Sequence, residues 1–143
     1  MENMANTYFS AQTMRLMMIL LFCFTGLKTT AQEQARDIVG QWLTEKGEAK
    51  VSIYIESGLY VGKIIWVKDD KENAKLNTLV LSGFKYDSET REWNDGTVYD
   101  PRHGHKADGY LALKDSKTLK VVGYKAFRWI SDTELWTRIE SNP

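Results

Sequence analysis

Apolar and β-branched residues recur along this chain in short runs, roughly every ten residues, and turn-forming residues separate the runs. Residues 51–55 alternate between apolar and polar positions, as expected for a strand with one buried face. Glu56-Ser57-Gly58 then leads into the apolar run 59–67, so the two runs predict a hairpin. With the run that opens at Gly40, further strands at 79–86, 97–99, 109–113, 119–124 and 133–139 give about eight strands.

No segment after the first 31 residues keeps a helical apolar period, and Pro101, the only proline of the folded body before its last residue, falls in a predicted loop. Sequential hairpins in so short a chain favour an up-and-down barrel over a Greek-key sandwich, because a meander needs no long crossover. We therefore expect an all-β fold, a small antiparallel up-and-down barrel with a short lead-in at residues 32–37. The polar stretch 68–77 is the longest connection and predicts a solvated loop.

The two ends of the predicted barrel carry a matching pair of motifs. Gly40-Gln41-Trp42 opens the first strand, and Trp136-Thr137-Arg138 closes the last one. This pairing resembles the closure of lipocalin-like (calycin-type) barrels, in which an arginine stacks on the indole at one end, a contact of about 0.5–2 kcal/mol. We expect Trp42 and Arg138 to form a structural seal. Alternation puts Trp136 and Arg138 on one face, and the sequence leaves open whether that face points inward.

Candidate interior positions follow from keeping the strand lysines outside, since an unpaired ammonium is costly to bury. The residues that alternation then places inside are Ile64, Trp66, Phe84, Tyr86, Leu111, Leu113, Leu119 and Val121. An eight-stranded barrel is either filled by its side chains or holds one small ligand, and both alternatives stay open here. If a ligand pocket exists, we expect Trp66, Phe84, Tyr86 and Tyr99 to line it, with tyrosine hydroxyls as polar contacts.

The first 31 residues predict a signal peptide. Arg15 precedes the apolar run 16–24, and small residues follow at 29–31. The run is shorter than the roughly 20 residues of a membrane span. Met14 is an alternative start to Met1, cleavage after Ala31 would leave a single domain at 32–143, and bulky Phe22 before Cys23 disfavours a lipid anchor. We expect a periplasmic or secreted protein without a membrane anchor.

Charge and cysteine content exclude several classes. The chain has 19 Lys and Arg against 19 Asp and Glu, so nothing favours nucleic acid or an anionic membrane as a partner. The only cysteine lies in the predicted signal peptide, which leaves no disulfide or thiol chemistry. His103-x-His105 with Asp100 has metal-ligand chemistry, but the segment reads more simply as a turn capped by Asp100. We expect no metal, no cofactor and no catalytic residues.

Several strings together resemble the exported bacterial domain-of-unknown-function family 2147. They are DIVGQWLT at 37–44, YVGKIIW at 60–66, GFKY at 83–86, GTVYDP at 96–101, LKVVGY at 119–124 and WTRI at 136–139. The resemblance implies an exported lipocalin-like protein without an established reaction. The chain departs from the pattern in three places: it lacks the Asn-Pro-Asp-Pro-rich insertion near residues 68–78, has Gly104-His105-Lys106-Ala107 after the Tyr-Asp-Pro turn, and has Val122 where an arginine is frequent.

Three functions compete at this point. The leading hypothesis is a barrel that binds a small apolar or amphipathic ligand in the cell envelope. The alternative is a filled barrel whose surface binds an envelope protein, as an inhibitor does, through exposed aromatic residues. The surface candidates are Tyr54, Tyr110, Tyr124, Phe127 and Trp129, although Phe127 and Trp129 also fit a lid over the barrel mouth. A metal-dependent enzyme using His103 and His105 is the third and weakest hypothesis.

Overall fold

The computed structural model describes residues 33–126 and 131–140. The chain divides into two compact units, residues 1–36 and 37–143; in the first, residues 33–35 are helical. The predicted signal peptide and the predicted lid residues Phe127 and Trp129 lie outside the described residues. No helix in the described part of the chain is long and apolar enough to cross a membrane.

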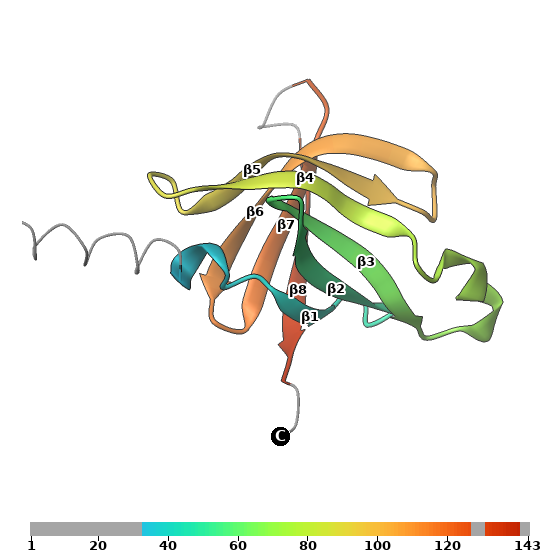
Figure 1. Cartoon of the computed structure of the whole chain (residues 1–143). Helices are drawn as coiled ribbons and strands as arrows, with labels where there is room; N and C mark the ends of the chain where they lie inside the picture. Colours follow the sequence, from blue (N-terminus) through green and yellow to red (C-terminus); the bar gives the residue numbers. More distant parts are fainter. Residues whose placement is uncertain (1–32, 127–130, 141–143) are drawn as a thin grey trace, which may run out of the picture. The chain divides into compact units, whose positions relative to one another are not determined.

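The second unit is a closed antiparallel barrel in which each strand pairs with the next and β1 also pairs with β8 (Figure 1). Its elements are β1 (Gly40–Leu43), β2 (Ala49–Glu56), β3 (Leu59–Val67), the short 3-10 helix η1 (Asp70–Lys75), β4 (Leu79–Asp87), β5 (Glu92–Asp100), β6 (His105–Asp115), β7 (Thr118–Tyr124) and β8 (Ser131–Ile139). The predicted all-β, up-and-down, eight-stranded barrel is therefore confirmed. Because consecutive strands are antiparallel, the connections lie alternately at the two ends of the barrel.

The β2–β3 hairpin forms where the sequence predicted it. Ser57 and Gly58 both have positive φ angles, 51° and 81°, and Glu56 pairs with Leu59 across the turn. Two central residues with positive φ match the right-handed twist of the flanking strands. The string Asn94-Asp95-Gly96 is typical of a turn by its residue types, but it is part of β5, where Asp95, with a φ of 62°, marks an irregularity in the pairing with β6.

A bulge in β3 overturns one predicted orientation. Val51 pairs with Ile64 but its neighbour Lys50 pairs with Trp66, so Ile65 is the extra residue. A bulge interrupts the two-residue alternation of side chains. Ile64 is buried, whereas Ile65 and Trp66 are 40% and 38% exposed. The prediction that Trp66 faces the interior is therefore wrong: its ring lies outside, 5.0 Å from the ammonium of Lys50.

The two halves of the barrel interior differ in how they are filled. Bulky side chains close the half that holds the β2–β3, β4–β5 and β6–β7 turns; the largest of them, fully buried, are Trp42, Trp93, Phe84, Ile53, Leu111 and Leu119. Smaller aliphatic side chains line the half nearer the β1–β2, β5–β6 and β7–β8 connections; these are Val51, Ile64, Val80, Val98 and Val121. We call these halves the closed half and the open half.

Candidate functional site

Trp42 and Arg138 meet at the closed end. The Trp42 ring is fully buried, its Nε1 donates to the Ile38 carbonyl at 2.8 Å, and the Arg138 guanidinium lies 4.2 Å from the ring centroid. Arg138 also donates to three backbone carbonyls, those of Ser116 at 2.8 Å, Val39 at 3.3 Å and Asp37. These contacts tie the β6–β7 turn and the segment before β1 to the indole, which gives the pair the role of a seal.

A depression of about 1710 Å³ opens at this end of the barrel, between the connecting loops and the open half, and we call it the cavity. Valines and Ile64 form its apolar wall, and Trp136, only 4% exposed, projects into it from β8. Charged residues of the β1–β2 and β5–β6 turns, of the β3–β4 connection and of the start of β8 surround the mouth. An apolar wall below a polar rim accommodates a molecule with an apolar part and a polar head.

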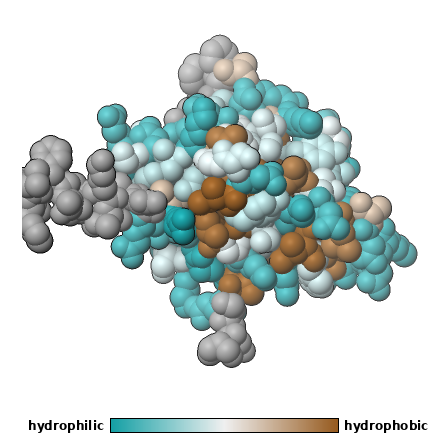
Figure 2. All heavy atoms as spheres, in the orientation of Figure 1, coloured by the Kyte–Doolittle hydropathy of each residue, from teal (hydrophilic) through white to brown (hydrophobic). Residues whose placement is uncertain are grey.

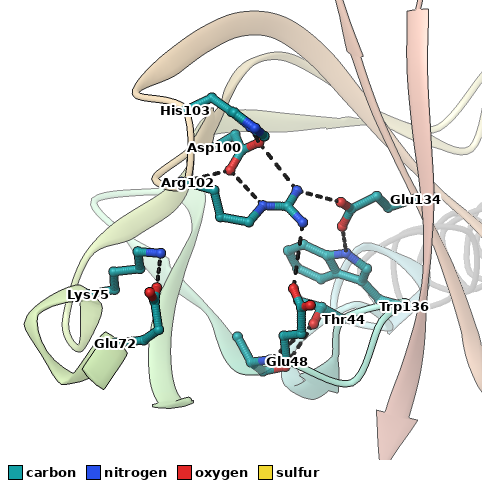
Figure 3. A network of polar contacts seen from close by, with 10 residues as sticks. Thr44, Glu48, Glu72, Lys75, Asp100, Arg102, His103, Glu134 and Trp136 are labelled. Atoms are coloured by element: carbon teal, nitrogen blue, oxygen red, sulfur yellow. Dashed lines mark hydrogen bonds and ion pairs between the residues drawn. The ribbon is translucent and has the colours of Figure 1, made fainter. Parts of the chain in front are cut away.

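Arg102 is the centre of a polar network at this mouth (Figure 3). Its Nε and Nη2 donate to the two oxygens of Asp100, at 3.0 and 3.2 Å, in a bidentate pair. Nη2 also donates to Glu134 on β8 at 3.2 Å, and Nη1 lies 3.7 Å from Glu48 in the β1–β2 turn. Arg102 thus links the β5–β6 turn to two elements across the mouth.

Glu134 connects the network to the cavity wall. Its Oε2 accepts from Nε1 of Trp136 at 2.9 Å, while its Oε1 accepts from Arg102 (Figure 3). The two residues lie on the same face of β8, two positions apart, so the strand itself presents the carboxylate directly above the indole. Both carboxylate oxygens are held, which fixes the orientation of the group.

The network changes the pKa of its members. Partial burial disfavours ionisation of Asp100, but the hydrogen bonds from Arg102 and His103 outweigh it and hold the pKa of Asp100 well below its usual range. The bond to Asp100 raises the pKa of Arg102. Both groups are therefore charged throughout the neutral range, and the ion pair does not titrate there.

The structure separates the four residues predicted to line a ligand pocket. Tyr99 borders the cavity at the rim, with the ammonium of Lys106 5.9 Å from its ring. Phe84 is fully buried in the closed half, and Tyr86 packs 4.9 Å from the Trp93 ring there, so neither reaches the cavity. Trp66 is on the outer surface. Phe84 and Tyr86 miss the cavity because they lie toward the filled end of β4.

Arg102, Glu134 and Trp136 were not among the predicted site residues. Two signals pointed to them: the Asp-Pro-Arg-His string of the β5–β6 turn, and the period-two spacing of Glu134, Trp136 and Arg138. The second becomes decisive once Arg138 is known to face Trp42, because alternation then turns the other two residues inward as well. The question that the sequence left open for Trp136 is answered by its burial.

His103 belongs to the same turn. Its Nδ1 lies 2.8 Å from Oδ2 of Asp100, and its ring stacks on that of His105 at a centroid distance of 6.0 Å. In the described part of the chain, no three His, Cys, Asp or Glu side chains are grouped in a way that could hold a metal ion. The histidines therefore act here as neighbours of the Asp100–Arg102 pair.

The outer surface carries aromatic and apolar side chains. Tyr54 and Tyr110 each have a lysine ammonium near the ring, Lys63 at 5.9 Å and Lys120 at 5.4 Å. Figure 2 shows apolar groups exposed among hydrophilic ones on this face of the molecule. Exposed apolar side chains are common on protein surfaces and do not by themselves identify a partner.

Comparison with known proteins agrees with the geometry. A structure search finds the solved structure titled "Protein HP1028 from the human pathogen Helicobacter pylori belongs to the lipocalin family", with a TM-score of 0.58 and 16% sequence identity over 72% of this chain and 83% of that one. At that identity the likeness concerns the fold. A search of curated proteins finds no match.

The profile of one protein family matches most of the barrel. It covers residues 40–138, from the first residue of β1 to Arg138, and the family is described as "Uncharacterized protein conserved in bacteria (DUF2147)". The matched span includes the closed-end seal and the whole polar network. The chain belongs to the DUF2147 family and has a lipocalin-like fold.

Proposed function

We propose that this protein binds a small amphipathic molecule in the open half of its barrel. The observation that carries the proposal is the difference between the two ends: large aromatic rings close one half, whereas a depression of about 1710 Å³, bordered by valines, opens at the other. The apolar wall would take the hydrocarbon part of the ligand, and the Arg102 network would face its polar part. The lipocalin-like fold is consistent with this role.

We further propose that the protein is exported and acts in the cell envelope without catalysing a reaction. The support for export is the signal-peptide pattern at residues 1–31. Mass spectrometry of the protein isolated from its host's envelope fraction tests this part. A mass beginning at Gln32 supports export, and an intact N-terminus in the cytosolic fraction contradicts it.

Binding is tested with N-phenylnaphthylamine, an uncharged dye that fluoresces in apolar surroundings. We expect saturable binding to the mature protein. Val121→Phe should weaken it, because Val121 lines the cavity and a larger ring there takes up its volume. Ile55→Phe is the matched control, since Ile55 is 41% exposed and does not border the cavity.

The outcome is read together with unfolding curves of all three proteins. Equal dye binding by the folded wild type and the folded Val121→Phe variant would place the dye elsewhere and contradict the cavity as the binding site. Native mass spectrometry of the same samples then identifies any molecule that copurifies with the wild type and is lost from the cavity variant.

A further inference from the structure

The inward face of β8 carries acidic groups above an indole. Alternation along the strand places Asp132, Glu134 and Trp136 on one face, and all three border the cavity. Trp136 is nearly buried, whereas the two acidic residues approach the mouth. A molecule entering the open half therefore passes carboxylates first and then meets an aromatic ring.

The positive charge of Arg102 is already matched within the network. Asp100 forms a bidentate ion pair with the guanidinium and Glu134 accepts a further hydrogen bond from it, while a carboxylate oxygen of Glu48 lies 3.7 Å from Nη1. Three carboxylates thus surround one guanidinium, which leaves an excess of negative charge at the mouth. An anionic head group would have to displace one of these carboxylates from Arg102 and remain close to the others.

The surrounding loops do not reverse this balance. The β3–β4 connection brings Lys68, Lys71 and Lys75 to the rim together with three acidic residues, and Lys75 is paired with Glu72. Across the whole described lining, eight Asp and Glu side chains face six Lys and Arg side chains. Outside the Arg102 network the described lining is balanced, with five acidic and five basic side chains, so the excess of negative charge lies at the centre of the mouth.

Trp136 supplies a second, independent preference for a cation. The face of an indole ring attracts ammonium groups through its quadrupole, and quaternary ammonium ligands are bound in this way by aromatic side chains. Glu134 already accepts from the indole N–H at 2.9 Å, so ring and carboxylate are held next to each other. Because Glu134 binds the N–H edge of the indole, an ammonium group over the ring face would have the carboxylate beside it, with its alkyl chain directed along the valines.

Resting on the ligand-binding function proposed above, we infer that the open half selects an amphiphile with a cationic head group, an alkylammonium or quaternary ammonium compound, which Glu134 and Trp136 contact at the mouth of the cavity.

The test compares three probes that share a dodecyl chain and differ in their heads: dodecyltrimethylammonium, dodecyl sulfate and uncharged dodecyl maltoside. Each is titrated below its micelle concentration against the mature protein, by calorimetry. We expect the cationic probe to bind on the order of tenfold more tightly than the sulfate, with a preference that decreases as salt is added. The uncharged probe should fall between them.

Variants identify the groups responsible. Glu134→Gln should weaken binding of dodecyltrimethylammonium roughly fivefold and leave dodecyl maltoside unchanged, because a single charge near the surface is lost. Glu48→Gln, at a more exposed position, should act in the same direction with a smaller effect. Glu56→Gln is the matched control, since it removes a negative charge at the exposed far end of β2. Arg102→Gln should strengthen cation binding.

The possible results separate the two proposals. If all three probes bind equally, or if the sulfate binds most tightly and loses affinity in Arg102→Gln, the head-group inference is overturned while the ligand-binding function stands. If no probe binds the folded wild type, the proposed function fails and the inference with it. A preference for the cation that Glu134→Gln does not reduce would overturn the assignment to this residue.

Discussion

Each end of the barrel holds an arginine near a tryptophan, and the two arginines have different partners. At the closed end, Arg138 stacks on Trp42 and donates to backbone carbonyls of three segments. At the open end, Arg102 donates to side-chain carboxylates and contacts Trp136 only through Glu134. Backbone carbonyls cannot leave without unfolding a segment, whereas carboxylates can be replaced by other groups. The first arrangement therefore serves stability, and the second remains accessible to a ligand.

The largest effect expected is on stability at the closed end. Trp42→Ala should lower the free energy of unfolding by about 3–5 kcal/mol, because it removes a fully buried indole from a packed interior. Trp136→Ala should cost about 1–3 kcal/mol, since its ring borders a cavity that water can enter. Urea unfolding of both variants measures the difference. Equal losses would show that the open half is packed as tightly as the closed one.

Two glycine-to-alanine substitutions compare the packing of the two halves, because each adds one methyl group. A Cβ at Gly96 would lie 2.3 Å from the ring of the fully buried Phe84, whereas one at Gly123, which borders the cavity, would meet only the Ala107 Cβ at 3.4 Å and the Val98 Cβ at 3.8 Å. Gly96→Ala should therefore destabilise the barrel by about 1–3 kcal/mol, and Gly123→Ala by clearly less. Thermal unfolding tests this pair. A tolerated alanine at 96 would mean that the closed half can repack.

The next largest effect on stability is expected from replacing each of the two arginines by methionine. Arg138→Met should cost about 1–3 kcal/mol, from the lost hydrogen bonds and the lost cation–π contact. Arg102→Met should change stability by no more than about 1 kcal/mol, because its partners are solvent-accessible carboxylates. Chemical unfolding at moderate salt compares them. A larger loss from Arg102→Met would assign its network to the maintenance of the fold.

The sequence predicted the barrel more fully than it predicted the site. Periodicity and turn residues are local signals, so strand number, the β2–β3 hairpin and the meander order could be derived from them. The placement of Trp66 could not, because one extra residue in β3 reverses the alternation and leaves no mark in composition. The Asp-Pro-Arg-His string marks the turn that carries Arg102 but does not show its role, which comes from Glu48 and Glu134, and these join it only when the barrel closes.

The residues that line the cavity could not be predicted from the sequence either. Alternation assigned Phe84 and Tyr86 to the interior, but their position along β4 decides whether they fill the barrel or line a pocket. Both lie toward the β4–β5 turn, in the closed half, whereas Val80 of the same strand borders the cavity. The height of a residue in a barrel depends on the stagger between strands, which follows from bulges and register shifts rather than from any single segment.

The smallest effect expected is the change in the free energy of unfolding at acidic pH, and it comes from Asp100 at the open end. The pKa of Asp100 is held below its usual value near 4, so the folded protein resists protonation of this group more than the unfolded chain does. Its contribution is therefore fully present above about pH 4 and is lost as the pH falls below that value toward the pKa of the folded state.

Asp100→Asn should lower the free energy of unfolding by roughly 1 kcal/mol at pH 7, and the difference from the wild type should narrow as the solution is acidified. Asp108→Asn, at an exposed position on β6, is the matched control and should show a smaller gap. Urea unfolding at a series of pH values measures both. A gap for Asp100→Asn that stays constant down to strongly acidic pH would show that its bond to Arg102 contributes through geometry rather than through charge, and would remove the electrostatic distinction between the two ends of the barrel.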